Sequence, residues 1–346
     1  MTKWHTMWLG VGIVGCWVGA IAVGLHSQPV SAPVAHPSPA AKSTPMPTPA
    51  LDPMSIAAIR ARAYSGSPIT TLENLGEQGG YRNAIVTYQS DGLTIRALMS
   101  TPDGAKPVGG WPVVILGHGY INPAVYQTNG PEYRGFIAAL AKAGYLVIKP
   151  DYRGHGLSQG TPEGGHFSPV YAYDLLNLIA SIKQYPDANP GRIGLLAHSM
   201  SGHTALRAIV STSDIKATVL MAGVVGSFDD IFYNWSHSPV ANDLPAIVQT
   251  DRQNLIAAHG EPRQNPQYWA EASAINYVRN VTGAVQVDQS AGDSIVPKIF
   301  SDHLVSALQQ AGKPVEYNLY PGNDHQFSLN RTALLQHILN FYKTHL

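Results

Sequence analysis

Cysteine is almost absent from this 346-residue chain, and the single one, Cys16, lies in an apolar stretch near the N-terminus. The rest of the sequence therefore provides no disulfide, no thiol nucleophile and no cysteine-based zinc site. Charged residues are also scarce, at 13%, and they balance, because Lys and Arg together number 22 and so do Asp and Glu. Nucleic-acid-binding domains normally have a basic excess, so we expect no nucleic-acid partner.

Apolar residues, by contrast, make up 45% of the chain. That share is enough for a large buried core, and it argues against disorder over most of the length. A chain of this length fits two small domains or one α/β domain. We interpret residues 56–346 as one domain, because no internal repeat or second linker divides them.

The N-terminal region has two parts of different composition. Residues 7–25 contain no charged side chain, and these 19 residues come close to the ~20 that cross a bilayer as a helix. We expect residues 1–27 to be a membrane anchor or a signal segment, and the Pro/Ala-rich residues 28–55 to be an extended linker. A retained anchor, a cleaved signal peptide and a lipoprotein signal at Cys16 remain open. Each places the rest of the chain outside the cytoplasm, either membrane-anchored or secreted.

Short apolar segments alternate with helical ones in the remainder of the chain. Asp91-Gly92 between residues 83–90 and 93–100 is typical of a two-residue hairpin. Further strands are predicted at 113–116, 145–149, 192–197, 217–221, 285–288 and 315–320, and helices at 132–143, 169–184, 200–211, 297–310 and 329–342. This alternation predicts an α/β fold with a mostly parallel central sheet and helices on both faces.

One interval, residues 224–282, breaks the alternation. It contains Trp235 and Trp269, and its helical periodicity is patchy. We interpret it as a small cap insertion over the carboxyl edge of the sheet, where ligands bind in open α/β sheets. Deleting residues 226–267 is then expected to change the substrate range.

Ser199 lies where a predicted strand runs directly into a predicted helix. A nucleophile elbow has this arrangement, because the sharp turn raises the serine hydroxyl above the sheet. The usual pattern is G-x-S-x-G, whereas Ala197 and Ser201 occupy the flanking positions here. Both are small, so close approach of the backbone remains feasible. The alternative, a surface serine that only caps a helix, does not account for the strand that precedes it.

Two further loops carry the residues that a serine nucleophile needs. Serine is activated by a base, which a carboxylate orients, and on such sheets the chain order is Ser, Asp, His. Asp293 follows the strand at 285–288, and His325 follows the strand at 315–320. Because parallel strands end at the same edge, we expect both side chains to lie near Ser199. Asp324, next to the base, is the alternative acid.

The strand at 113–116 continues into His118-Gly119-Tyr120. The backbone N–H of Tyr120 is expected to be one oxyanion donor and that of Met200, at the helix start, the other. We interpret His118 as a residue that packs and hydrogen-bonds beneath the site.

Taken together, these motifs show a resemblance to a known family. Residues 83–346 resemble the prolyl-oligopeptidase-like and dienelactone-hydrolase-like branch of the α/β-hydrolase superfamily. The matching pieces are His118-Gly119 and residues 151–158, 192–200, 293–297 and 320–327. The resemblance implies a Ser199/Asp293/His325 catalytic triad, hydrolysis through an acyl-enzyme, and no cofactor or metal. The departures are Ala197 and Ser201 at the elbow, and Gln289-Ser290 where His-Gly is common.

The peptidases of this branch usually carry a β-propeller ahead of the catalytic domain. Roughly thirty residues separate the linker from the hairpin here, and no ~40-residue repeat is present. We therefore expect a carboxylic-ester hydrolase acting on a small ester, with membrane contact only through the N-terminal segment. A serine peptidase acting on short peptides is the alternative, in which Asp229 and Asp230 either hold a substrate amine or are simply solvated. A non-catalytic binding protein on the same fold is the third interpretation.

Overall fold

The structure, a computed structural model, describes residues 50–163, 165–235, 246–322 and 324–346. The N-terminal segment predicted at 1–27, and the linker up to residue 49, lie outside these residues. The packed unit begins slightly before the predicted boundary at 56, because Met54 is buried and Ser55 caps the helix α1 (Ile56–Ala61). No helix in the described part of the chain is both long and apolar enough to cross a membrane.

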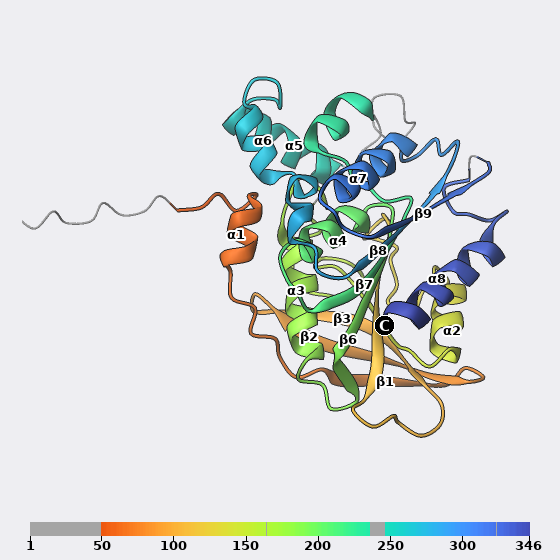
Figure 1. Ribbon diagram of the computed structural model, residues 1–346. Helices are drawn as coiled ribbons and strands as arrows, with labels where there is room; N and C mark the ends of the chain where they lie inside the picture. The colour runs from red at the N-terminus through yellow and green to blue at the C-terminus, as the bar shows by residue number, and fades with distance from the viewer. Residues whose placement is uncertain (1–49, 164, 236–245, 323) are drawn as a thin grey trace, which may run out of the picture. The chain divides into compact units, whose positions relative to one another are not determined.

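The predicted α/β fold is confirmed by a central sheet (Figure 1). In the described residues its nine strands run in the order β1-β2-β3-β5-β4-β6-β7-β8-β9. The bounds are β1 (Thr70–Glu77), β2 (Tyr81–Ser90), β3 (Leu93–Pro102), β4 (Trp111–Gly117), β5 (Leu146–Pro150), β6 (Ala188–His198), β7 (Ile215–Met221), β8 (Ala284–Ser290) and β9 (Val315–Tyr320). The strands from β5 to β9 in this order pair in parallel, and β1, β2 and β3 add an antiparallel edge.

The predicted hairpin is confirmed as β2 and β3, which pair residue for residue from Ser90↔Leu93 outward. Asp91 and Gly92 have φ values of 53° and 78°, as a tight turn matched to the strand twist requires. The edge strand β1 was not predicted. Seven of its eight residues are exposed and one is half-buried, so no apolar alternation marks it in the sequence.

Helices cover both faces of the sheet, as predicted. On one face, α2 (Arg134–Lys142) and α8 (Arg331–His345) share a buried cluster with Val114, Leu116 and Val219. On the other face, α3 (Val170–Ile182), α4 (Ser201–Ile209) and α7 (Lys298–Gln310) pack against Val113 and Ile115. Alternate side chains of the fully buried strand β4 thus enter two separate cores.

The interval predicted as a cap lies between β7 and β8. It contains a π-helical turn at Asp230–Asn234, then α5 (Ala246–His259), α6 (Pro266–Ala272) and a 3₁₀ segment, η2 (Ala274–Asn280). Phe228 and Trp269, at 0% and 2% exposure, belong to the same apolar cluster as α3 and α4. This interval therefore completes the main core, and removing residues 226–267 would expose it.

Candidate active site

Ser199 lies on the sharp turn between β6 and α4. Its φ of 55° is in the left-handed region, which is uncommon for a residue with a side chain and typical of a nucleophile elbow. Its N–H donates to Met221 O at 3.0 Å, and its carbonyl accepts from Val224 N–H at 2.9 Å. The end of β7 and the chain beyond it therefore hold the turn on both sides.

The unusual residues around the elbow have a structural reason. The backbone N–H of His198 donates to Ser201 Oγ at 2.8 Å, and this oxygen lies 2.8 Å from Gly117 O. Ser201 thus links the elbow to the neighbouring strand β4. Close approach of the backbone occurs one residue later, because a Cβ at Gly202 would lie 2.7 Å from the Cα of Gly223.

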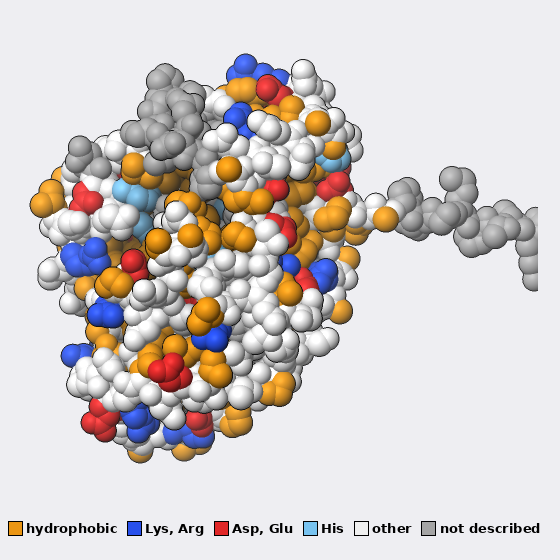
Figure 2. Space-filling model, turned by 180° about the vertical axis from the view of Figure 1, so that it is seen from behind, with side chains coloured by type: hydrophobic (Ala, Val, Ile, Leu, Met, Phe, Trp, Pro, Cys, Tyr) orange, Lys and Arg blue, Asp and Glu red, His pale blue; other side chains and the backbone are white. Residues whose placement is uncertain are grey.

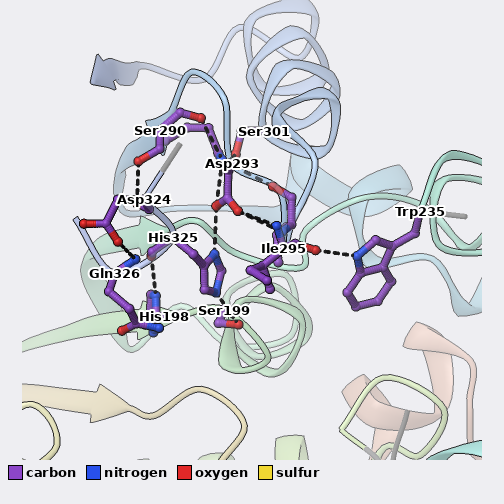
Figure 3. Close-up of polar contacts among 12 residues, drawn as sticks. His198, Ser199, Trp235, Ser290, Asp293, Ile295, Ser301, Asp324, His325 and Gln326 are labelled. Atoms are coloured by element: carbon purple, nitrogen blue, oxygen red, sulfur yellow. Dashed lines mark hydrogen bonds and ion pairs between the residues drawn. The ribbon is translucent and has the colours of Figure 1, made fainter. Parts of the chain in front are cut away.

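The structure brings the predicted acid and base to Ser199 (Figure 3). His325 Nε2 lies 2.9 Å from Ser199 Oγ, and His325 Nδ1 lies 2.7 Å from Asp293 Oδ2. The carboxylate requires the ring proton on Nδ1, which leaves the Nε2 lone pair facing the serine hydroxyl. Asp293 comes from the loop after β8 and His325 from the loop after β9, at the carboxyl edge of the sheet.

Asp293 is itself held by its surroundings. Its Oδ1 accepts the backbone N–H groups of Ile295 and Val296 at 2.8 and 3.1 Å. Its Oδ2 accepts a hydrogen bond from Gln289 Nε2 at 3.3 Å. The hydroxyl of Ser301 in turn donates to Gln289 Oε1 at 2.8 Å. Gln289, which departs from the pattern of the resembling family, therefore supports the acid.

The alternative acid, Asp324, turns away from the imidazole. Its carboxylate accepts backbone N–H groups of Gln326 and Ser328, which close the turn after His325. Slight burial raises its pKa, but these donors outweigh burial and lower the pKa overall. Ser290 donates to the Asp324 carbonyl at 2.8 Å, so this second departure from the family pattern supports the His325 loop.

The two residues predicted to supply oxyanion donors line a common hollow. The structure places Tyr120 and Met200 on the wall of the pocket that contains Ser199 and His325. A Cβ at Gly119 would lie 3.1 Å from Ser199 Cβ, so this loop passes close to the elbow and a side chain here would be tightly packed. His118 Nδ1 lies 2.7 Å from Gly119 O. Since C=O and N–H of one trans peptide point in opposite directions, this bond turns the Tyr120 N–H away from His118.

Tyr133, which no sequence motif marked, connects three loops of the site. Its Oη accepts the Gly119 N–H at 2.7 Å and lies 2.8 Å from His198 Nδ1. His198 Nε2 then lies 3.2 Å from the His325 carbonyl. Burial, with His325 nearby, lowers the pKa of His198 to about 3, so its ring stays neutral. The one ring proton lies on Nε2 and is donated to the His325 carbonyl, which can only accept. Burial raises the pKa of Tyr133 to about 12, so the phenol keeps its proton.

Comparison with known proteins agrees with this geometry. Residues 112–257 match the family model described as serine aminopeptidase, S33. Dipeptidyl peptidase family member 6 of Caenorhabditis elegans is 26% identical over 275 residues, which cover 71% of this chain and 35% of that protein. Dipeptidyl aminopeptidase BIII of Pseudoxanthomonas mexicana is 24% identical over 222 residues, which cover 63% of this chain and 30% of that protein. The chain thus spans about a third of the length of these curated relatives.

Solved structures show the same fold. Acetyl xylan esterase from Paenibacillus sp. R4 superposes with a TM-score of 0.63 at 17% identity, covering 84% of this chain and 92% of that one. Porphyromonas gingivalis dipeptidyl peptidase 4 superposes with a TM-score of 0.60 at 20% identity, covering 78% of this chain and 36% of that one. The chain has the fold of these α/β hydrolases. The fold that the sequence motifs indicated is therefore confirmed.

The pocket that contains Ser199 has a volume of about 440 Å³. Beyond Ser199 and His325, its walls include the apolar side chains of Val224, Trp235 and Val248. Trp235 Nε1 donates to Ile295 O at 2.7 Å, which joins the insertion to the loop that carries Asp293. The interval between β7 and β8 thus forms part of the pocket wall. It also contacts Ile295, whose N–H donates to the Asp293 carboxylate.

The acid predicted in the interval between β7 and β8 has partners of its own. Asp230, predicted either to hold a substrate amine or to be solvated, is buried, accepts the Ser227 N–H at 2.9 Å and lies 3.0 Å from His303 Nδ1. Because Asp230 is buried and already paired, it neither is solvated nor is free to hold a substrate amine.

No cluster of three or more potential metal ligands is present in the described residues. On the face seen in Figure 2, side chains of both charges are interspersed, without a large field of one sign.

Proposed function

We propose that the chain hydrolyses a carboxylic ester or a related acyl bond through Ser199, with His325 as base and Asp293 as its orienting acid. The observation that carries this proposal is the continuous hydrogen-bonded line from Ser199 Oγ through the two ring nitrogens of His325 to Asp293, at 2.9 and 2.7 Å. A binding protein on this fold has no need for such an alignment.

In the first half of the reaction, Ser199 Oγ attacks the acyl carbon while His325 Nε2 accepts the hydroxyl proton. The N–H groups of Tyr120 and Met200 stabilise the negative charge on the acyl oxygen. The bond to the leaving oxygen then breaks as His325 returns its proton to that atom. In the second half, water attacks the acyl-enzyme with His325 again as base, and Ser199 is regenerated.

Labelling with a fluorophosphonate probe tests this function directly. The probe reacts with activated serines, so we expect the protein from residue 50 onward to be labelled and Ser199→Ala to remain unlabelled. Circular dichroism would establish that both proteins are folded. A folded wild-type protein that does not react would refute the hydrolase mechanism and favour the binding-protein interpretation.

Peptide hydrolysis is a second candidate, favoured by the two dipeptidyl peptidase relatives. Ester hydrolysis is favoured by the acetyl xylan esterase structures, which are matched over 92% of their own length. Comparing kcat/KM for 4-nitrophenyl acetate and butyrate with that for dipeptidyl 4-nitroanilides separates the two. Esters are expected to react faster; higher values for the anilides would make the protein a peptidase.

We also propose an extracytoplasmic location, with residues 1–27 as anchor or signal and residues 28–55 as spacer. The support is the uncharged 19-residue run and the proline-rich composition that follows it. Expression of the full chain, followed by membrane fractionation and determination of the mature N-terminus, distinguishes anchor, cleaved signal and lipoprotein. A full-length protein in the cytosolic fraction would contradict all three.

A further inference from the structure

A second hollow adjoins the catalytic pocket. It has a volume of about 530 Å³ and shares Tyr120, Tyr133, His198 and Gln326 with the pocket that contains Ser199. Its remaining wall is formed largely by the beginnings of α2 and α8, including Arg331. The two hollows are therefore neighbouring compartments of one site, and they differ in chemistry.

The mechanism indicates which half of the substrate each compartment receives. The pocket at Ser199 has apolar walls, including Trp235 and Val248, and suits an acyl chain. His325 must deliver a proton to the leaving oxygen, so the leaving group lies on the side of the His325 loop. Gln326, the next residue, lines both compartments. A leaving group that extends past Gln326 therefore enters the second hollow.

The second hollow presents the guanidinium of Arg331 on the same wall as the carboxyl side chain of Glu132. Arg331 donates to the Gln326 carbonyl at 2.9 Å, and its guanidinium carbon lies 4.7 Å from the ring centroid of Phe136. Arg134, on the same wall, donates to the Asn129 carbonyl at 3.1 Å. Within the described residues, neither arginine forms an ion pair with a carboxylate. The carboxylate of Glu132, which also lines this hollow, lies beside Gly130 and forms no ion pair with either arginine in the part of the chain that the structure describes.

We propose that this second hollow holds the leaving group and that Arg331 binds an anionic oxyacid group on it, a carboxylate or a phosphate. The inference rests on the proposed ester hydrolysis and narrows its substrates to esters of acidic alcohols. The chemistry of the step is unchanged: the Ser199–acyl bond forms, the acyl–oxygen bond breaks, and the alcohol leaves with the proton from His325. The planar guanidinium, already oriented by Phe136 and Gln326, matches the two oxygens of such a group.

Three acetyl esters that differ in the leaving group test this assignment: 3-acetoxybenzoate, 3-acetoxyphenyl phosphate and the neutral 3-acetoxybenzamide. For Arg331→Gln we expect KM for the preferred anionic ester to rise about tenfold, while the benzamide changes less than about twofold. The effect should shrink as salt is raised, because the hollow is open to solvent. The relative kcat/KM of the two anionic esters tells which acid group is preferred.

Arg279→Gln, which removes an exposed arginine elsewhere, is the matched control and should leave all three esters unchanged. An equal fall in kcat for charged and neutral esters would overturn the proposal, since Arg331 would then only support the His325 loop. If wild type hydrolyses none of the esters, the proposed function fails. Calorimetry with the alcohol products, 3-hydroxybenzoate and 3-hydroxyphenyl phosphate, still tests the anion site: weaker binding of either to Arg331→Gln supports it, and equal or absent binding of both refutes it.

Discussion

At the residue scale, Tyr133 shows how one side chain can organise a site without touching the reacting atoms. Its φ of 66° is uncommon for a bulky residue, and it directs the phenol between the oxyanion loop and His198. One hydrogen bond holds the N–H of Gly119, the residue before Tyr120, and the other holds the ring of His198. Tyr133 is thus a positioning residue for the oxyanion donors.

Tyr133→Phe is expected to lower kcat about tenfold with little change in KM, because it leaves the Gly119 N–H and His198 Nδ1 without their shared partner. Steady-state kinetics with 4-nitrophenyl acetate measures the split. Tyr145→Phe is the matched control, since Tyr145 is a buried tyrosine of the α2–α8 cluster rather than of the site. A normal kcat, or an effect confined to KM, would remove Tyr133 from the positioning role.

Ser201 allows a second prediction at this scale. Ser201→Ala removes the acceptor of the His198 N–H and the link to Gly117 in a fully buried location. We expect the free energy of unfolding to fall by about 1–3 kcal/mol, as for a buried group left unpaired. Urea unfolding followed by tryptophan fluorescence measures it. A midpoint equal to that of wild type would mean that the packing of α4, and not this hydroxyl, holds the elbow.

At the element scale, periodicity identified most of the sheet and its helices. The prediction at 169–184 became α3 (Val170–Ile182), and that at 297–310 became α7 (Lys298–Gln310). Continuous apolar runs marked the strands buried on both faces, whereas β1 escaped because an exposed edge strand needs no apolar pattern. Residues 224–282 lie between β7 and β8, and the buried Phe228 and Trp269 make this interval a part of the core.

Helix α5 supplies an element-scale test of the acyl pocket. Val248 on α5 lines this pocket and is 6% exposed. Val248→Phe should reduce its volume and lower kcat/KM for 4-nitrophenyl octanoate relative to the acetate by about tenfold, in the range by which pockets discriminate small apolar groups. Val108→Phe, at a fully exposed site, is the control. An unchanged ratio of the two esters would exclude α5 from acyl selection.

At the scale of the whole molecule, buried histidines tie stability to pH. His118, His155, His166, His198 and His203 are all at most 5% exposed. Burial lowers the pKa of His155 to about 4 and that of His166 to about 3, and lowers those of the other three as well. Each ring stays neutral in the folded protein, whereas the unfolded chain takes up protons below about pH 6.5.

The protein should therefore lose stability as pH falls from about 6.5 toward 4, by at most about 1.4 kcal/mol per pH unit for each histidine. Asp151, Asp174 and Asp288 act in the opposite direction, because burial raises the pKa of each carboxyl, to about 6 for Asp151 and Asp288. Five histidines outweigh three acids. Urea midpoints at pH 7.5 and 5 measure the loss, and His166→Phe should reduce it. Equal urea midpoints at both pH values would contradict the prediction that the buried histidines outweigh the buried acids.

The sequence alone determined the α/β fold, because burial on both faces imposes apolar strands and amphipathic helices that can be read locally. It also indicated Ser199, Asp293 and His325, since each follows a strand whose carboxyl end lies at one edge of the sheet.

Only the tertiary structure decided which side chains surround these three residues. Tyr133, Trp235 and Arg331 come from segments distant in the chain, and their roles depend on side-chain directions and packing that no local pattern encodes. The same holds for Gln289 and Ser201, whose hydrogen bonds show why they stand where the family pattern has other residues.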